Sequence, residues 1–364
     1  MASAAIYDSI DKYVVQLVCL EPLHVGGASG DSSEVLIHPT DQIPFLQASG
    51  ICGALRSCCV KICGQEKTNE LFGTHEDDQE SRIRFSDGKF ENDESLKMEL
   101  RPRVKIDPVS GTVSSGALKG APNRESGHKF DMEHVGAGAK FSFEICLYGA
   151  AQEENEVVLQ CLSSLNEREV QFGGQKSNGC GYVKVSKVLH RRYDMKNATD
   201  RRLWRDESGL VQIDLPQLDA SKHQIAYEIQ VHATTESELL VKGIAAEDFG
   251  KNAPKAENIQ NANREYIIPG SSLKGSVRNR MEMIAAYMGL DEGIVADGFG
   301  KASDGAQDGV TGNLRFRDVI VRNGNDAGEM EFERTRIRID KFTGGVINGA
   351  LFSELNVAGE LRKR

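Results

Sequence analysis

The chain has 364 residues, of which 39% are hydrophobic and 27% are charged, a composition that argues against an intrinsically disordered protein. The length suggests two to three domains. The formal net charge of −10 argues against a protein that coats nucleic acid by overall charge, although a local basic groove remains compatible with it. No apolar run reaches membrane-spanning length and no signal peptide precedes the eight cysteines, which predicts a cytoplasmic protein with reduced thiols and no membrane partner.

The first of two repeat units, residues 8–188, begins with an apolar strand from Val14 to Gly26. A loop and a small-residue turn that contains Arg56 lead into a helix, and a hairpin follows at residues 107–118. Residues 139–148 alternate apolar and polar side chains as a half-buried strand does, and a helix is expected near 152–168. A glycine-rich loop at 173–181 then leads into the last strand.

A polar, charged stretch at 189–222 is interpreted as a linker, and the second unit covers 223–364. Its expected elements are a strand at 225–232, a helix at 273–288 that ends near Gly289, and a hairpin at 340–351. Counterparts of the last strand, helix and glycine loop of the first unit are missing from it. We therefore expect another polypeptide or a longer chain to complete this unit, and the isolated chain to be unstable or to aggregate.

Two segments match in register without a gap, and they show that the units are repeats. Residues 103–118 (RVKIDPVSGTVSSGAL) align with residues 336–351 (RIRIDKFTGGVINGAL). The small-residue turn with its arginine, the Phe-Gly signals at 72–73 and 299–300, and the segments 82–87 and 313–318 recur in the same order. A period above 200 residues indicates duplicated domains rather than a solenoid. Strands mixed with two helices per unit predict an α+β fold of two tandem ferredoxin-like (RRM-type) units, each with an inserted β-hairpin.

The segment Pro269-Gly-Ser-Ser-Leu-Lys-Gly-Ser-Val-Arg278 opens a helix, and a helix N-terminus is a natural anion site. Lys274 and Arg278 lie four residues apart, on one helix face, where both can reach phosphates. The alternative is an ordinary capped helix with solvated charges. The first unit keeps Arg56 at the matching place but has Cys52 where the second has Lys274, so the two units should bind an anion through different contacts.

The glycine-rich loop at 173–181 (GGQKSNGCG) suits contact between backbone amides and a phosphate or a sugar. It is neither a Walker loop nor a dinucleotide-binding fingerprint, because its spacing differs and it does not open a helix. By itself this motif is a weak signal of function.

Taken together, the segment 268–278, the hairpin turns at 106–111 and 339–344, the Phe-Gly signals and the 173–181 loop resemble the RAMP superfamily, and within it the guide-RNA backbone subunits of type III CRISPR effectors. The resemblance implies that the chain binds crRNA, stacks with other effector subunits along it, and meets complementary target RNA. The implied RNA-binding residues are His24, Gly26, Gly27, Arg56, Gly173, Gly174, Lys176, Ser177, Gly179, Gly181, Ser271, Ser272, Lys274 and Arg278.

The resemblance also implies that each hairpin acts as a thumb that wedges into the guide–target duplex and flips out a base pair. The thumb residues would be Asp107, Val113 and Leu118 in the first unit, and Asp340, Val346 and Leu351 in the second. The alternative for these side chains is that they pack the hairpin itself.

Cleaving members of this family carry an aspartate in the loop after the first strand, and counting back from the helix start places it near Asp31. Asp31 could orient or deprotonate a 2′-hydroxyl that attacks the adjacent phosphate, or hold a divalent metal, Mg²⁺ or Mn²⁺. The alternative is a solvated loop residue. In the second unit the count falls near Pro254, so Asp248 is only a second choice.

Three other interpretations compete with a cleaving backbone subunit. One is a non-cleaving structural guide-binding subunit, and another is a crRNA-processing endonuclease, which generally uses a histidine near the first helix. The third is an unrelated RRM-like module, which would need aromatics on its sheet, whereas aromatic residues are 6% of this chain. Cys58, Cys59 and Cys63, with His75 downstream, lack zinc-site spacing, and buried thiols are the favoured interpretation.

Overall fold

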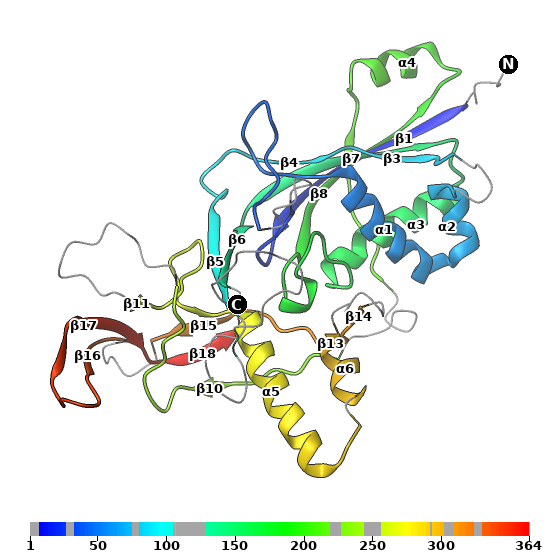
Figure 1. Ribbon diagram of the computed structural model, residues 1–364. Helices are drawn as coiled ribbons and strands as arrows, with labels where there is room; N and C mark the ends of the chain where they lie inside the picture. Colours follow the sequence, from blue (N-terminus) through cyan, green and yellow to red (C-terminus); the bar gives the residue numbers. More distant parts are fainter. Residues whose placement is uncertain are drawn as a thin grey trace, which may run out of the picture. The chain divides into compact units, whose positions relative to one another are not determined.

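The computed structural model describes residues 7–26, 33–74, 80–104, 106, 129–218, 227–243, 256–291, 293–301, 309–323 and 330–363. The chain forms two compact units of mixed α and β structure (Figure 1). The N-terminal unit consists of residues 1–97, 135–176 and 180–227, and the C-terminal unit consists of residues 98–134, 177–179 and 228–364. The predicted α+β class is confirmed. Among the described helices, none is both long and apolar enough to cross a bilayer.

The N-terminal unit is built on a sheet with β1 (Ser9–Cys19) at its centre. Strands β7 (Lys140–Tyr148) and β8 (Val183–Asp194) flank β1, and both run antiparallel to it. The sheet order is β2-β4-β7-β1-β8-β9, and β3 also pairs with β7. The shorter strands are β2 (Phe45–Leu46), β3 (Ile83–Phe85), β4 (Gly88–Phe90) and β9 (Val211–Ile213).

Three helices of the N-terminal unit cover one face of this sheet: α1 (Ala48–Cys63), α2 (Gln65–Phe72) and α3 (Gln152–Asn166) (Figure 1). Alternate residues of β7 point into the core, as the sequence alternation predicts, and α3 occupies the predicted helix. The core between sheet and helices includes Leu17, Ile51, Phe141, Leu162 and Phe172, all almost fully buried. Burial of each such side chain stabilises the unit by about 1.5–3 kcal/mol.

The stretch 189–222, expected as a linker, carries regular structure in its described part. Strand β8 continues to Asp194, α4 (Ala198–Arg205) follows, and β9 pairs with β8 at the edge of the sheet. Tyr193, fully buried, packs edge-on against Trp204 of α4 and donates a hydrogen bond to the carbonyl of Ser208. These apolar anchors attach the stretch to the N-terminal unit despite its polar composition.

The C-terminal unit contains several small sheets rather than one large one. One has the order β10-β18-β15-β12, and a second has the order β11-β17-β16. The strands of this unit include β5 (Met98–Val104), β10 (Ala233–Thr234), β11 (Ala256–Glu257), β12 (Ile267–Ile268), β13 (Gly300–Lys301), β14 (Val310–Thr311), β15 (Val319–Arg322), β16 (Glu331–Ile339), β17 (Val346–Val357) and β18 (Glu360–Lys363). Strand β6 (Lys129–Val135) pairs with β5. The helices are α5 (Gly270–Met288) and α6 (Gly293–Phe299), and α5 ends at left-handed Gly289, as predicted.

The strand predicted at 225–232 is wrong for its described part. Residues 227–232 are outside regular structure, and Tyr227, Ile229 and Val231 are all highly exposed. The counterpart in the first repeat is β1, which two neighbouring strands hold on both sides. Among the described residues of the C-terminal unit, no strand takes the place of either neighbour, so the alternating sequence has no partner to pair with.

Several backbone details recur at matching positions of the two repeats. Gln42 and Arg264, each six residues before the first residue of its helix, share a left-handed backbone with φ of 59° and 60°. The backbone amide of Ala48, which begins α1, donates to Asp87 Oδ1 at 2.7 Å, and the amide of Gly270, which begins α5, donates to Asp318 Oδ1 at 2.9 Å. These shared contacts support a common origin for the two segments.

Candidate functional site

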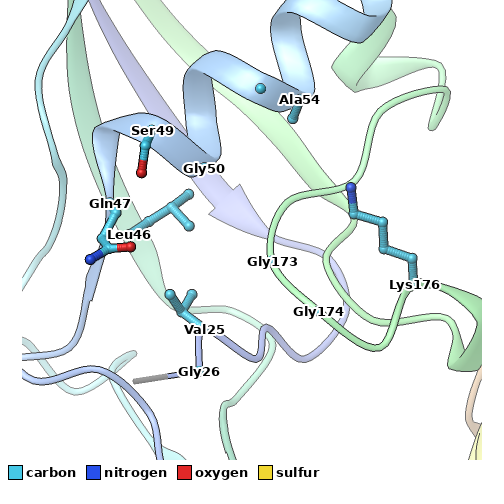
Figure 2. Close-up of a pocket in the computed structure, with 11 residues that line it drawn as sticks. Val25, Gly26, Leu46, Gln47, Ser49, Gly50, Ala54, Gly173, Gly174 and Lys176 are labelled. Atoms are coloured by element: carbon cyan, nitrogen blue, oxygen red, sulfur yellow. The ribbon is translucent and has the colours of Figure 1, made fainter. Parts of the chain in front are cut away.

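A pocket of about 410 Å³ opens in the N-terminal unit where three segments meet (Figure 2). The segment after β1 contributes Val25 and Gly26. The end of β2 contributes Leu46, and the beginning of α1 with its N-cap residue contributes Gln47, Ser49, Gly50, Gly53 and Ala54. The glycine-rich loop contributes Gly173, Gly174 and Lys176. The structure therefore brings together four of the predicted binding residues, Gly26, Gly173, Gly174 and Lys176, from distant parts of the sequence.

The shape of the glycine-rich loop depends on glycine. Gly173 has φ of +69°, and a Cβ there would lie 2.3 Å from the carbonyl oxygen of His24. The next amide, that of Gly174, donates to the same oxygen at 2.8 Å. Gly181 has φ of +88°, and its amide donates to the carbonyl of Pro22 at 2.8 Å. A side chain at Gly173 would push the loop away from the segment after β1, and one at Gly181 would collide with the carbonyl oxygen of Phe172, so both glycines allow close backbone approach.

Gln171 shapes the loop from inside, and sequence inspection gives no sign of its role. Its side chain is 3% exposed, and Nε2 donates to the carbonyls of Lys176 at 3.1 Å and Cys180 at 2.8 Å. One amide group thus joins both ends of the turn that carries Lys176. The exposed Lys176 and Gly174 are presented on a constrained backbone.

The start of α1 offers the pocket one amide that has no acceptor among the described residues. The amide of Ala48 is taken by Asp87, and the amide of Gly50 bonds to the carbonyl of Gln47 at 2.9 Å. The amide and hydroxyl of Ser49 lie between these two, on the wall of the pocket. A helix N-terminus favours anions, so Ser49 together with Lys176 can contact an anionic group. Ser49 is a site residue that the sequence analysis missed.

Two of the residues predicted to bind RNA in the first repeat have other contacts. His24 is 5% exposed, and its carbonyl supports the glycine loop as described above. Arg56 Nη2 donates to Asn69 Oδ1 at 2.9 Å and to the carbonyl of Gly73 at 3.1 Å. Arg56 therefore contacts the end of α2 (Gln65–Phe72) and is not among the residues that line the pocket.

In the second repeat, the predicted anion site at the start of α5 is partly filled by protein. The first amide, that of Gly270, is buried and bonded to Asp318, whose carboxylate already supplies a negative charge there. Ser271, Ser272 and Lys274 are half-buried on the first turn. Burial, and secondarily Arg278, lowers the pKa of Lys274, so the cationic form of this side chain is destabilised.

Arg278 repeats the arrangement of Arg56. Its Nη1 donates to the carbonyl of Gly300 at 3.2 Å, and Nε donates to Glu282 Oε1 at 2.7 Å. The tip of the glycine loop also belongs to the C-terminal unit, where the carbonyl of Ser177 accepts from the amide of Phe316 at 3.1 Å. A Cβ on Gly179 would lie 2.6 Å from the carbonyl oxygen of Phe316, so this position has no room for a side chain.

The second predicted hairpin is confirmed as β16 and β17, which pair antiparallel. Asp340 organises its turn by accepting from the amides of Phe342 and Thr343, both at 2.8 Å, and these bonds lower the pKa of its carboxyl. Phe342 at the tip is 99% exposed and Val346 is 58% exposed. The exposed aromatic ring of Phe342 is therefore a feature of the hairpin tip that the sequence analysis did not single out. The side chain of Leu351 lies outside the described part.

Several predicted residues lie outside the described residues: Gly27, Asp31, Asp107, Val113, Leu118 and Asp248. Within the described part of the chain, no three His, Cys, Asp or Glu side chains gather closely enough to hold a metal ion. Cys58 and Cys59 are buried in the core, as predicted, and Cys63 is half-buried with its Sγ 3.5 Å from that of Cys59.

Comparison with known proteins identifies the family of the chain. Over 134 residues the chain is 25% identical to a CRISPR system Cms endoribonuclease Csm3 from Methanocaldococcus jannaschii, an alignment that covers 35% of this chain and 50% of that protein. The chain thus spans half the length of this curated relative. A chain from the cryo-EM structure of the type III-B Cmr-beta complex bound to cognate target RNA is similar with a TM-score of 0.40 and 15% identity, over 50% of this chain and 61% of that one. The RAMP superfamily matches residues 16–184 and 233–363. Because these two segments span most of its length, the chain belongs to the RAMP superfamily.

Proposed function

We propose that this chain is a guide-RNA-binding backbone subunit of a type III CRISPR effector, built from two tandem ferredoxin-like units at 8–188 and 223–364. The observation that carries the proposal is the pocket in which the start of α1, Gly26 and the glycine-rich loop converge. In the N-terminal unit, β1, α1, β4, β7, α3 and β8 follow in the βαββαβ sequence, with β1 between β7 and β8. Its partners would be crRNA, target RNA and neighbouring effector subunits in the cytoplasm.

In the proposed binding step, the pocket holds the phosphate backbone of the guide. Lys176 supplies a positive charge, and the Ser49 amide and hydroxyl supply hydrogen-bond donors. The exposed backbone at Gly26 and Gly174 lets the sugar-phosphate chain approach closely. These contacts are independent of base identity, as guide binding requires, because sequence is read by pairing between guide and target.

Target contact is assigned to the hairpins. The Phe342 ring at the tip of the β16–β17 hairpin, with Val346 beside the turn, forms an apolar wedge that can enter a base stack. Displacing a base pair would free the sugar-phosphate backbone from A-form geometry. A 2′-hydroxyl could then align with the adjacent phosphorus.

The proposed cleavage occurs in the first repeat at Asp31, with Asp248 as a second choice in the second repeat. The 2′-oxygen attacks the adjacent phosphorus, and the bond from phosphorus to the 5′-oxygen breaks. The 2′-hydroxyl proton leaves to a base and the 5′-oxygen gains a proton, so the products carry a 2′,3′-cyclic phosphate and a 5′-hydroxyl. Asp31 would orient or accept the 2′-hydroxyl proton. A divalent cation, Mg²⁺ or Mn²⁺, would neutralise charge on the phosphate.

The deciding experiment uses the chain assembled with guide RNA and its partner subunits. A labelled complementary RNA is added with Mg²⁺, with Mn²⁺ or with EDTA, and products are sized on a sequencing gel. Asp31→Ala should lose one cut while target binding persists. Asp41→Ala, which removes another exposed loop aspartate, is the matched control and should cut like wild type.

Two other outcomes would revise the proposal. If Asp31→Ala cuts as wild type does, the active carboxylate lies elsewhere, and Asp248→Ala is tested next. If all variants bind the target and none cuts, the chain is a non-cleaving structural subunit. Cleavage of unprocessed guide precursor by the isolated chain would instead favour a crRNA-processing endonuclease.

A further inference from the structure

Four of the eight cysteines lie together where α1 packs against α3 in the N-terminal unit (Figure 1). Cys58, Cys59 and Cys63 belong to α1, and Cys161 of α3 forms side-chain hydrogen bonds with Cys58 and Cys59. Cys58, Cys59 and Cys161 are each at most 4% exposed, whereas Cys63 is half-buried. Cys63 is therefore the thiol of this cluster that a small solute can reach from solvent.

The side chain of Cys63 is held against that of Cys59. The two residues are four apart on α1, a spacing that places side chains on the same face of a helix. Their Sγ atoms are 3.5 Å apart, and the hydrogen bond between them can have its proton on either sulfur. Cys63 Sγ also donates to the carbonyl of Cys59 at 3.3 Å and lies 3.6 Å from Thr68 Oγ1. The exposed thiol thus rests on a buried one.

The surroundings of Cys59 favour a thiolate in this pair. The hydrogen bond from Cys161 is the largest of the causes that lower the pKa of Cys59 to about 6, and the hydrogen bond with Cys63 acts in the same direction. Near neutral pH the two sulfurs of Cys59 and Cys63 therefore share one proton. Because the proton can sit on either sulfur, the negative charge can pass to Cys63, and the thiolate is the form that reacts with oxidants.

The end of α1 allows an S–S bond between these residues, but under strain. Side chains four apart on a helix have Cβ atoms about 5–6 Å apart, whereas a relaxed disulfide needs about 3.5–4.5 Å. Cys63 is the last residue of α1, and Gly64 follows it with φ of +86°. The terminal turn can tighten more readily than the middle of a helix, because helix ends fray. A strained disulfide is easily reduced, so a bond formed here should be reversible.

We propose that Cys59 and Cys63 are a peroxide-reactive pair that closes to a reversible disulfide within α1. The pairing of an accessible thiol with a resolving thiol is the arrangement that favours oxidation to a disulfide. The site takes hydrogen peroxide as its oxidant and requires no guide RNA, so the proposal goes beyond RNA binding.

The reaction has two steps. The Cys63 thiolate attacks one oxygen of hydrogen peroxide, the O–O bond breaks, and hydroxide leaves as Cys63 becomes a sulfenic acid. The hydroxide takes the proton of Cys59, whose sulfur then attacks the Cys63 sulfur. The S–O bond breaks, the S–S bond forms, and the second hydroxide leaves and is protonated by solvent. Each sulfur gives up one electron to the peroxide, and two thiols with one peroxide yield one disulfide and two water molecules.

The first test counts free thiols in the full chain after brief exposure to limited hydrogen peroxide without denaturant. Wild type should lose two of its eight thiols, and dithiothreitol should restore both. Cys59→Ala should stop at a sulfenic acid on Cys63, which dimedone traps, and Cys63→Ser should keep its thiols because Cys59 is out of reach of solvent. Cys146→Ser removes another half-buried cysteine, on β7, and should still lose two thiols.

The second test identifies the partners by peptide mass spectrometry, after free thiols are alkylated. Trypsin cuts after Lys61, between the two cysteines, so the proposed disulfide joins peptides 57–61 and 62–67. Cys58 shares the first peptide with Cys59, so the link should persist in Cys58→Ser. Because the wild-type map alone shows the link, the proposal stays testable even where circular dichroism finds a variant unfolded.

Four results would overturn the proposal. The native wild-type chain might lose no thiols, or dithiothreitol might fail to restore those that are lost. Peptide 57–61 might instead be linked to peptide 141–168, which contains Cys161, and the disulfide would then join two helices. Absence of the link from folded Cys58→Ser would assign the bond to Cys58. None of these readouts depends on guide RNA, so failure of the proposed RNA-binding function would leave this result unchanged.

Discussion

Arg278 Nη1 donates a hydrogen bond to the carbonyl oxygen of Gly300 at 3.2 Å, and Arg56 makes the same bond to Gly73 at 3.1 Å in the other repeat. In sequence, each arginine follows a helix start, and each glycine ends a Phe-Gly pair. The repeated arginine and the repeated Phe-Gly pair are therefore the two partners of one hydrogen bond, which occurs once in each repeat. The bond satisfies a carbonyl at the end of the second helix of each repeat. The duplicated arginines are thus explained by the architecture of the helical pair.

Replacing Arg278 with alanine should destabilise the α5–α6 pair. The variant loses the bond to Gly300 and leaves that carbonyl without its partner, at a cost of about 1–1.5 kcal/mol in the free energy of unfolding. Arg280→Ala, an exposed arginine on the same helix, is the matched control and should change stability by less than about 0.5 kcal/mol. Urea unfolding followed by circular dichroism measures both, and equal effects of the two variants would refute the assignment.

Gly173→Ala should disrupt the pocket. Its φ of +69° disfavours any Cβ, and the Cβ would meet the carbonyl oxygen of His24 at 2.3 Å, so the loop must move away from that segment. We expect guide-RNA affinity to fall by roughly tenfold or more, which corresponds to about 1.4 kcal/mol. Gly275→Ala adds a methyl group on α5 with nothing within 4 Å and should leave affinity unchanged. Unaltered binding by Gly173→Ala would remove the loop from the site.

The elements that could be predicted from sequence are those set by local patterns. The alternation in β7, the apolar spacing in α3, the Gly289 helix end and the Asp340 turn each depend on residues close in the chain. Contacts that join distant positions were out of reach. The amide of Ala48 donates to Asp87, which lies 39 residues away in the sequence. The role of Gln171 depends on the folded loop, because its side chain bonds to the carbonyl of Lys176 only in that conformation.

The failed strand at 227–232 shows the limit of periodicity. Its pattern is as regular as that of β7, yet β7 pairs with β1 along nine residues while the described part of 227–232 lies exposed. A strand forms only where neighbouring strands accept its amides and carbonyls, and that depends on the rest of the fold. The stretch 189–222 shows the opposite limit: its polar composition predicted a linker, but its described part forms regular structure. The contact between Tyr193 and Trp204 anchors it to the N-terminal unit.

Lys274→Met should raise stability and lower RNA affinity at once. Burial lowers the pKa of Lys274 below that of an exposed lysine, so the unfolded chain holds this proton more tightly than the folded one. Stability of the wild type should therefore rise with pH as it passes through the lowered pKa towards the ordinary value of 10.5, and the Lys274→Met variant should lack that rise. Thermal melts between pH 7 and 10 check the first effect.

The RNA effect of Lys274→Met is read from salt dependence. Loss of one phosphate contact should reduce the slope of log affinity against log salt by roughly 0.7–0.9. Lys301→Met, which removes an exposed lysine elsewhere in the C-terminal unit, controls for the loss of one charge. If both variants change the slope equally, Lys274 is not a phosphate contact.

The ion pair between Glu238 and Arg334 should make the folding stability of the chain depend on pH in the acid range. The hydrogen bond from Arg334, then that from Asn356, lowers the pKa of Glu238 from 4.5 to about 2. Its contribution is therefore complete above the unfolded value of 4.5 and is lost as pH falls towards 2. Glu238→Gln should flatten this part of the pH profile, whereas Glu236→Gln, an exposed neighbour, should not.

Removing Arg101 should destabilise the C-terminal unit, because Arg101 makes a buried ionic contact there. Arg101 lies between the buried carboxylates of Glu99 and Asp318, so Arg101→Ala leaves two negative charges without compensation. Breaking such a buried pair costs about 3–5 kcal/mol, and the C-terminal unit should melt first. Arg205→Ala, which removes a 77% exposed arginine, should cost under about 1 kcal/mol.

Hydrogen exchange identifies the amides that lose protection in Arg101→Ala. We expect these to be the amides of α5 near Gly270, because Asp318 also accepts a hydrogen bond from the Gly270 amide. Protection lost uniformly over both units would contradict a local role for Arg101, and unchanged protection would show that strand β5 is not what covers the helix start.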